Sequence, residues 1–140
     1  PYELSLVGNV NVEIPPLPIT MTSYVSCILE TGILVGDMIH LSEKAWNPFI
    51  SKNIPLILGS SYINDYLKTI GFWLADDLFD LTPKFTANEI LQQYRSNLDI
   101  IHNMSYNELH SYYINHKQQI DSNFNLLETQ YFKFNTNNYK

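Results

Sequence analysis

The chain has 140 residues, of which 45% are hydrophobic and 16% are charged, with a formal net charge of −6. This length is sufficient for one domain with a core, and the apolar content excludes disorder along the whole chain. The acidic excess argues against a surface that binds a nucleic-acid backbone, and no apolar stretch approaches the ~20 residues of a membrane span.

Residues 1–22 combine loosely alternating apolar side chains with Pro15, Pro16 and Pro18. Alternation with a period of two predicts a strand, and prolines end regular structure. We interpret 1–22 as a strand and a Pro-rich linker from a preceding region. The start at Pro1, without an initiator Met, suggests that the sequence is a fragment of a longer protein.

Three short apolar segments predict the strands of a small parallel sheet. Residues 23–29 and 54–58 are typical of strands buried on both faces, and Cys27 in the first of them is expected to be a buried thiol. Residues 72–74 predict a third short strand. Helical patterns separate these segments, and alternating strands and helices indicate an α/β fold with a parallel sheet.

Several helices are predicted by periodicity and capping residues. Ser42 is the expected N-cap of the first, which Pro48 should kink or delay because proline removes a helical hydrogen bond. The further expectations are a helix over 62–70 that stops at Gly71, a helix capped by Thr86 or Asn88, and a helix that starts after Ser105, has Glu108 in a capping box and continues to Leu127.

Polar residues cluster where the first two strands end and the first helix begins. In an open parallel sheet, ligands bind outside the carboxyl ends of the strands. A lysine at a helix start suits a diphosphate, a carboxylate accepts hydrogen bonds from sugar hydroxyls, and a glycine lets the backbone approach a ligand. The candidate binding residues are therefore Glu30, Ser42, Glu43, Lys44, Gly59 and Ser60.

The order of these motifs resembles that of a glycosyltransferase family. The matching strings are Leu29-Glu30, Leu41-Ser42-Glu43-Lys44 and Ile54-Pro55-Leu56-Ile57-Leu58-Gly59-Ser60, which look like the C-terminal half of α1,3-fucosyltransferase-type enzymes. Residues 42–48, Tyr66-Leu67, Gly71-Phe72 and 76–80 also resemble phage and bacterial glycosyltransferase-like proteins. The sequence departs from the fucosyltransferase pattern at Thr31 and His40.

This resemblance implies half of a GT-B fold, in which a Rossmann-like three-layer domain over 23–134 binds a nucleotide sugar and a polar tail follows at 135–140. It implies that Glu43 binds the nucleotide ribose, that Lys44 binds the diphosphate and that Glu30 lies near the donor sugar. Gly59 and Ser60 would line the floor of the site.

The resemblance also implies an inverting transfer of a sugar to an acceptor hydroxyl, with a nucleoside diphosphate sugar as substrate and neither a cofactor nor a metal. The general base would lie outside this chain, in an N-terminal acceptor domain or a second chain. The expected compartment is the cytoplasm of a bacterium or of a virus-infected host.

Two other functions remain open. One is a non-catalytic structural or protein-interaction module that keeps a glycosyltransferase-like fold, for example in a virus particle. The other is an unrelated nucleotide-binding α/β module, which would lack the usual Gly-x-Gly-x-x-Gly signature. No metal site is expected, because the histidines lack the spacing of a helical metal pair and the acidic loop lacks the calcium-loop pattern. These residues are His40, His102, His110 and His116, and Asp76, Asp77 and Asp80.

Overall fold

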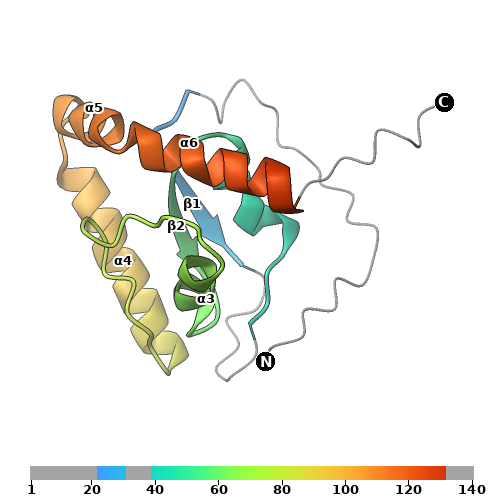
Figure 1. The fold of residues 1–140 in the computed structure, drawn as a ribbon. Coiled ribbons are helices and arrows are strands. Elements are labelled where there is room, and N and C mark those ends of the chain that lie inside the picture. Colours follow the sequence, from blue (N-terminus) through green and yellow to red (C-terminus); the bar gives the residue numbers. More distant parts are fainter. Residues whose placement is uncertain (1–21, 31–38, 132–140) are drawn as a thin grey trace.

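The computed structural model describes residues 22–30 and 39–131 and shows a mixed α/β chain that is mostly helical (Figure 1). Its elements are β1 (Val25–Leu29), the 3-10 helix η1 (Glu43–Trp46), α2 (Asn47–Ile50), β2 (Ile54–Leu58), α3 (Ile63–Thr69), α4 (Ala87–Asn103), α5 (Tyr106–Asn115), α6 (Lys117–Leu126) and the π-helical turn η2 (Leu127–Tyr131). Within this part of the chain, no helix combines the length and apolarity needed to cross a membrane. The predicted N-terminal strand and linker and the polar tail lie outside the described residues.

The two strands form a parallel sheet in which Val25 pairs with Ile54 and Leu29 with Leu58. All five residues of β2 are buried, as expected for a strand covered on both faces. β1 differs, because Cys27 and Leu29 are exposed. The prediction of a doubly buried first strand with a buried thiol is therefore wrong. Among the described residues, β2 is the one strand that pairs with β1.

Helices and the loop after α3 complete the core around β2. α4 contacts β2, and α2 contacts both strands as well as α6. In the view of Figure 1, α4 runs along one side of the molecule, α5 joins its end and α6 returns across the strands. The rings of Phe49 and Phe72 stack 4.5 Å apart, which joins α2 to the segment that follows α3.

The helix start at Ser42 has the predicted form. The Ser42 hydroxyl accepts a hydrogen bond from the Lys44 N–H, and the first turn is 3-10 in geometry. The α-helical geometry begins only at Asn47, which places Pro48 in the first turn of α2. Proline is tolerated there because the N–H groups of a first turn have no helical partner. The expectation of a late-starting helix is confirmed.

The predicted capping box of Ser105 with Glu108 is present, and Thr86, one of the two predicted caps of the preceding helix, forms a second capping box with Glu89. The helix from Ser105 is nevertheless shorter than expected, because it ends at Asn115 and a separate helix, α6, starts at Lys117. His116 lies at the break with φ −106° and ψ 12°, outside helical geometry. Its ring stacks on Trp73 at 5.3 Å, so the break places this side chain against the core.

The third predicted strand, over 72–74, is not formed. Instead, two buried asparagines bond the backbone of the irregular segment 72–81, which contains a turn after Ala75. Asn123 of α6 accepts from the Trp73 N–H at 2.7 Å and donates to the Trp73 carbonyl at 2.8 Å. Asn97 of α4 does the same for Asp80, at 3.0 Å and 2.8 Å. These side chains supply the hydrogen bonds that a neighbouring strand would otherwise supply.

We expect Asn123→Ala to lower the free energy of unfolding by about 2 to 4 kcal/mol, because two buried backbone groups lose their partners. Asn125→Ala is a matched control, since Asn125 lies on the same helix with an exposed side chain. Urea denaturation of both variants measures the difference. Equal stability of the two variants would show that the amide of Asn123 does not hold the segment.

Candidate functional site

Glu30 lies directly after β1, and its backbone N–H donates to the Leu58 carbonyl at 2.9 Å. Its side chain is only 2% exposed. Both carboxylate oxygens accept from the Ser42 N–H, each at 3.2 Å. A carboxylate has about four acceptor positions, and the Ser42 N–H is the one donor to Glu30 among the described residues. Burial of a carboxylate is costly unless it is hydrogen-bonded, so a ligand that donates hydrogen bonds to Glu30 would be favoured here.

Gly59 lies beside Glu30 at the end of β2. A Cβ atom at this position would lie 3.4 Å from the Glu30 Cβ and 2.8 Å from the Ile63 Cδ1. The space left by the missing side chain is therefore occupied by the protein itself. The structure places Gly59 at the predicted edge of the sheet, where it allows the close packing of Glu30 and α3.

The turn from β2 into α3 contains two buried hydroxyl groups without partners. Ser60 is 3% exposed and Ser61 is 9% exposed. Neither Oγ atom has a hydrogen-bond partner among the described residues. Ser61 follows Gly59 and Ser60 in the polar group that the sequence places after the second strand. Buried hydroxyls without partners are costly, and this favours a partner that is not among the described residues.

The remaining predicted residues lie on η1. Glu43 is half-buried and Lys44 is exposed, and the Lys44 ammonium makes no ion pair within the described ranges. The helical stretch that Ser42 opens consists of a four-residue 3-10 turn and a four-residue α-helix. Such a short stretch contributes less dipole than a full helix. Any stabilisation of an anion here depends mainly on Lys44.

The candidate site is therefore an edge of the sheet that is rich in hydrogen-bond acceptors. Lys44, two residues after Ser42, adds a positive charge. Contacts in the structure bring Glu30, Ser42 and Gly59 together, and Ser60 follows Gly59 directly. Glu30 would repel a phosphate placed against it, whereas it can accept hydrogen bonds from hydroxyl groups. The arrangement therefore suits a ligand with hydroxyls near Glu30 and a negative charge near Lys44.

The acidic loop is held by neighbouring side chains. Asp76 pairs with Lys68 at 3.0 Å, and Asp77 accepts from the Tyr112 hydroxyl at 2.6 Å. Hydrogen bonds from the hydroxyl and backbone N–H of Thr82 lower the pKa of Asp80 to about 2. No group of three or more His, Cys, Asp or Glu within 22–30 and 39–131 could hold a metal ion. Asp76 and Asp77 thus link the loop to α3 and α5, whereas the Asp80 carboxylate bonds Thr82 and Lys84 within the loop.

Comparison of this chain with protein-family models, curated proteins and solved structures finds no match. The candidate site therefore depends on the geometry of this chain and on the resemblance of its motifs.

The Gly59 contact leads to a stability prediction. Gly59→Ala should lower the free energy of unfolding by about 1 to 3 kcal/mol, because the added methyl overpacks the space filled by the Ile63 Cδ1. Ile63→Val removes that Cδ1 atom, so the Gly59→Ala cost should be smaller in the Ile63→Val background. A double-mutant cycle measured by urea denaturation gives this coupling. Equal costs in the two backgrounds would contradict the contact.

Proposed function

We propose that the chain is the nucleotide-sugar-binding portion of an inverting glycosyltransferase, with the donor bound at the carboxyl edge of the β1–β2 sheet. In this proposal the chain is a Rossmann-like half of a GT-B enzyme. The observation that carries it is the buried Glu30 carboxylate, which lies beside Gly59 and has one hydrogen-bond donor among the described residues, the Ser42 N–H.

Each proposed contact follows from the chemistry of its side chain. Glu30 accepts hydrogen bonds from hydroxyls of the donor sugar, and the Ser60 hydroxyl has no competing partner among the described residues. Lys44 pairs with the diphosphate, and its exposed position allows the ammonium to reach a ligand outside the sheet edge. Glu43, at the start of η1, accepts from the two ribose hydroxyls.

In the proposed reaction, an acceptor hydroxyl attacks the anomeric carbon from the face opposite the diphosphate. A carbon–oxygen bond forms as the bond between the sugar and the β-phosphate oxygen breaks, and that oxygen keeps the electron pair. Lys44 stabilises the charge that develops on the diphosphate, so it would contribute more in the transition state than in the ground state. The hydroxyl proton passes to a general base on an acceptor domain or second chain.

Isothermal titration of the full chain tests the proposal with uridine, guanosine, adenosine and thymidine diphosphates, followed by their glucose or mannose conjugates. Lys44→Ala should weaken both kinds of ligand by about tenfold or more, because a charge-assisted hydrogen bond contributes about 1.5–3 kcal/mol. Glu30→Gln should weaken only the conjugates, because Glu30 contacts the sugar. Lys117→Ala is the control, since Lys117 pairs with Asp121 on α6.

Circular dichroism of each variant establishes that it is folded. If no nucleotide releases heat with the folded wild-type chain, the proposal is wrong and the non-catalytic module is favoured. If Lys44→Ala and Lys117→Ala bind equally well, Lys44 does not contact the diphosphate.

A further inference from the structure

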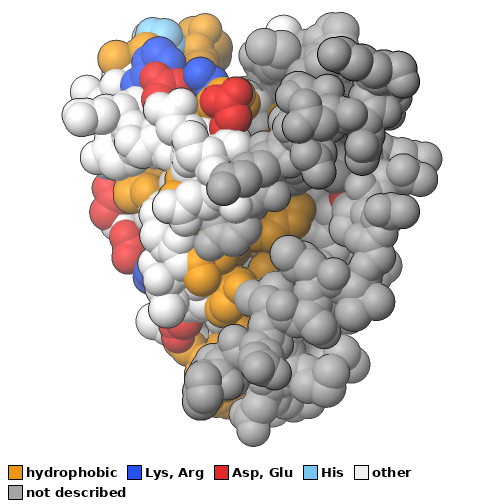
Figure 2. Space-filling view, turned by 45° about the vertical axis from the view of Figure 1, so that its right-hand side comes forward, with side chains coloured by type: hydrophobic (Ala, Val, Ile, Leu, Met, Phe, Trp, Pro, Cys, Tyr) orange, Lys and Arg blue, Asp and Glu red, His pale blue; other side chains and the backbone are white. Residues whose placement is uncertain are grey.

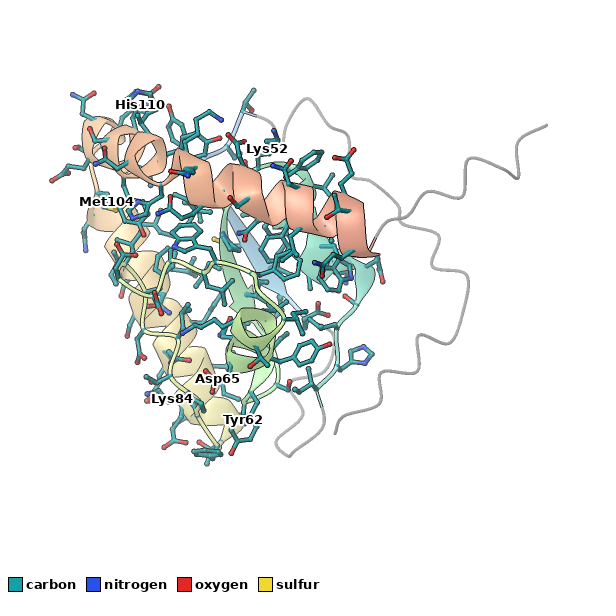
Figure 3. All side chains as sticks on the ribbon, in the orientation of Figure 1. Lys52, Tyr62, Asp65, Lys84, Met104 and His110 are labelled. Carbon is teal, nitrogen blue, oxygen red and sulfur yellow. The ribbon has the colours of Figure 1, made fainter. Side chains whose placement is uncertain are left out.

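The ring of His116 lies between two aromatic side chains at the break between α5 and α6. Trp73 stacks on it with ring centroids 5.3 Å apart and an interplanar angle of 19°, and the Tyr112 ring lies 4.2 Å away. The His116 side chain is 21% exposed. Figure 3 shows α5, which carries His110, turning into α6 beside Lys52. The break therefore holds an imidazole against the core at the point where two helices meet.

Both ring nitrogens of His116 face groups that only accept hydrogen bonds. Nδ1 lies 2.9 Å from the Tyr112 carbonyl oxygen, and Nε2 lies 3.4 Å from an oxygen of the Asp77 carboxylate. A neutral imidazole carries one N–H, so it can donate to only one of these groups and turns a lone pair toward the other. A protonated imidazole has two N–H groups and can donate to both. The surroundings of the ring thus match its charged form.

The two aromatic neighbours also act on the charge of this cluster. A cation within about 6 Å of an indole face is attracted by the electrons of the ring, so Trp73 favours the charged imidazole. The Tyr112 hydroxyl donates to the second oxygen of Asp77 at 2.6 Å. Burial and this hydrogen bond raise the pKa of Tyr112, so its hydroxyl keeps the proton that it donates. Tyr112 thereby holds the Asp77 carboxylate beside the imidazole.

The other charged side chains near this break pair with one another. The pairs are Lys68 with Asp76, and Lys52 and Lys117 with Asp121. Figure 2 shows basic, acidic and histidine side chains gathered at the top of the molecule, where α5 and α6 lie in Figure 1. Among the described residues, Asp77 is the one carboxylate that pairs with His116. A change in the charge of the imidazole therefore acts first on its contact with the loop that carries Asp77.

We propose that protonation of His116 fastens the loop that carries Asp77 to the break between α5 and α6, and that this contact is lost when the ring becomes neutral. Histidine is the side chain that ordinarily changes charge between about pH 5 and 8. In the folded chain the charged ring makes two hydrogen bonds and the neutral ring makes one, whereas both forms bond water in the unfolded chain. The contact therefore stabilises the folded chain at the acidic end of this range and is lost as the pH rises. None of these residues belongs to the proposed nucleotide-sugar site, so the inference is independent of that function.

Nitrogen-15 NMR of the His116 side chain in the full chain tests which ring nitrogen carries the hydrogen. The contact of Nδ1 with the Tyr112 carbonyl is the shorter one, so the neutral ring should keep its hydrogen on Nδ1. The charged ring should show hydrogen on both nitrogens. A neutral ring with its hydrogen on Nε2 would keep the bond to Asp77 and would overturn the proposal.

Urea denaturation at about pH 5.5 and about pH 8 tests the effect of this contact on stability. The midpoint of the unaltered chain should fall by about 0.5 M between the two pH values, because the ring loses its donor to Asp77. Asp77→Asn should remove most of this fall, because an asparagine amide can donate to the neutral Nε2. His102→Gln is the control and should keep the fall, since His102 is an exposed histidine in the last turn of α4.

A second variant tests the same contact from the side of the imidazole. His116→Phe keeps an aromatic ring beside Trp73 but has no proton to lose, so it should also lack most of the fall. Circular dichroism at both pH values establishes that each variant is folded. A fall in Asp77→Asn or His116→Phe equal to that of the unaltered chain would overturn the proposal, as would a midpoint of the unaltered chain that rises or stays constant between the two pH values.

Discussion

Two buried asparagine side chains hold the irregular segment 72–81 against the helices. Asn123 and Asn97 each donate to and accept from the backbone of one residue, Trp73 and Asp80 respectively. Buried backbone groups need partners, so these amides allow a segment without a strand neighbour to lie in the core. Phe72, at the start of this segment, stacks on Phe49 of α2 and so connects the loop to the helix that follows η1.

The same packing supports the candidate site. α2 contacts both strands, and η1 immediately before it presents Ser42 to the Glu30 carboxylate. Gly59 lets the Glu30 side chain lie against the end of β2. The edge of the sheet is thus built from three segments distant in sequence, and it combines a buried carboxylate with two unpaired hydroxyls among the described residues. This combination is the reason for proposing a hydroxyl-bearing ligand.

Sequence patterns predict the two strands, the capping box at Ser105 and the late helix start, because these features depend on residues close together in the chain. They also predict that Glu30, Ser42 and Gly59 meet, because parallel strands end at one edge. The prediction of a third strand over 72–74 is wrong because local sequence does not show whether a neighbouring strand or a buried asparagine side chain bonds the backbone groups there. Asn97 does share a helical face with Ile90, Tyr94 and Ile101, and a polar residue on an apolar face is a signal for a buried amide. The exposure of Cys27 depends on tertiary neighbours, which local sequence does not specify.

Amide chemical shifts of the full chain test the central claim, which is that the ligand binds at the carboxyl edge of the sheet. The chain is titrated with UDP-glucose, GDP-mannose and ADP-glucose. The account predicts that at least one of them shifts the backbone amide signals of Glu30, Ser42, Lys44 and Ser60 more than those of α4. Shifts confined to α4, or no shift with any of the three, would contradict it.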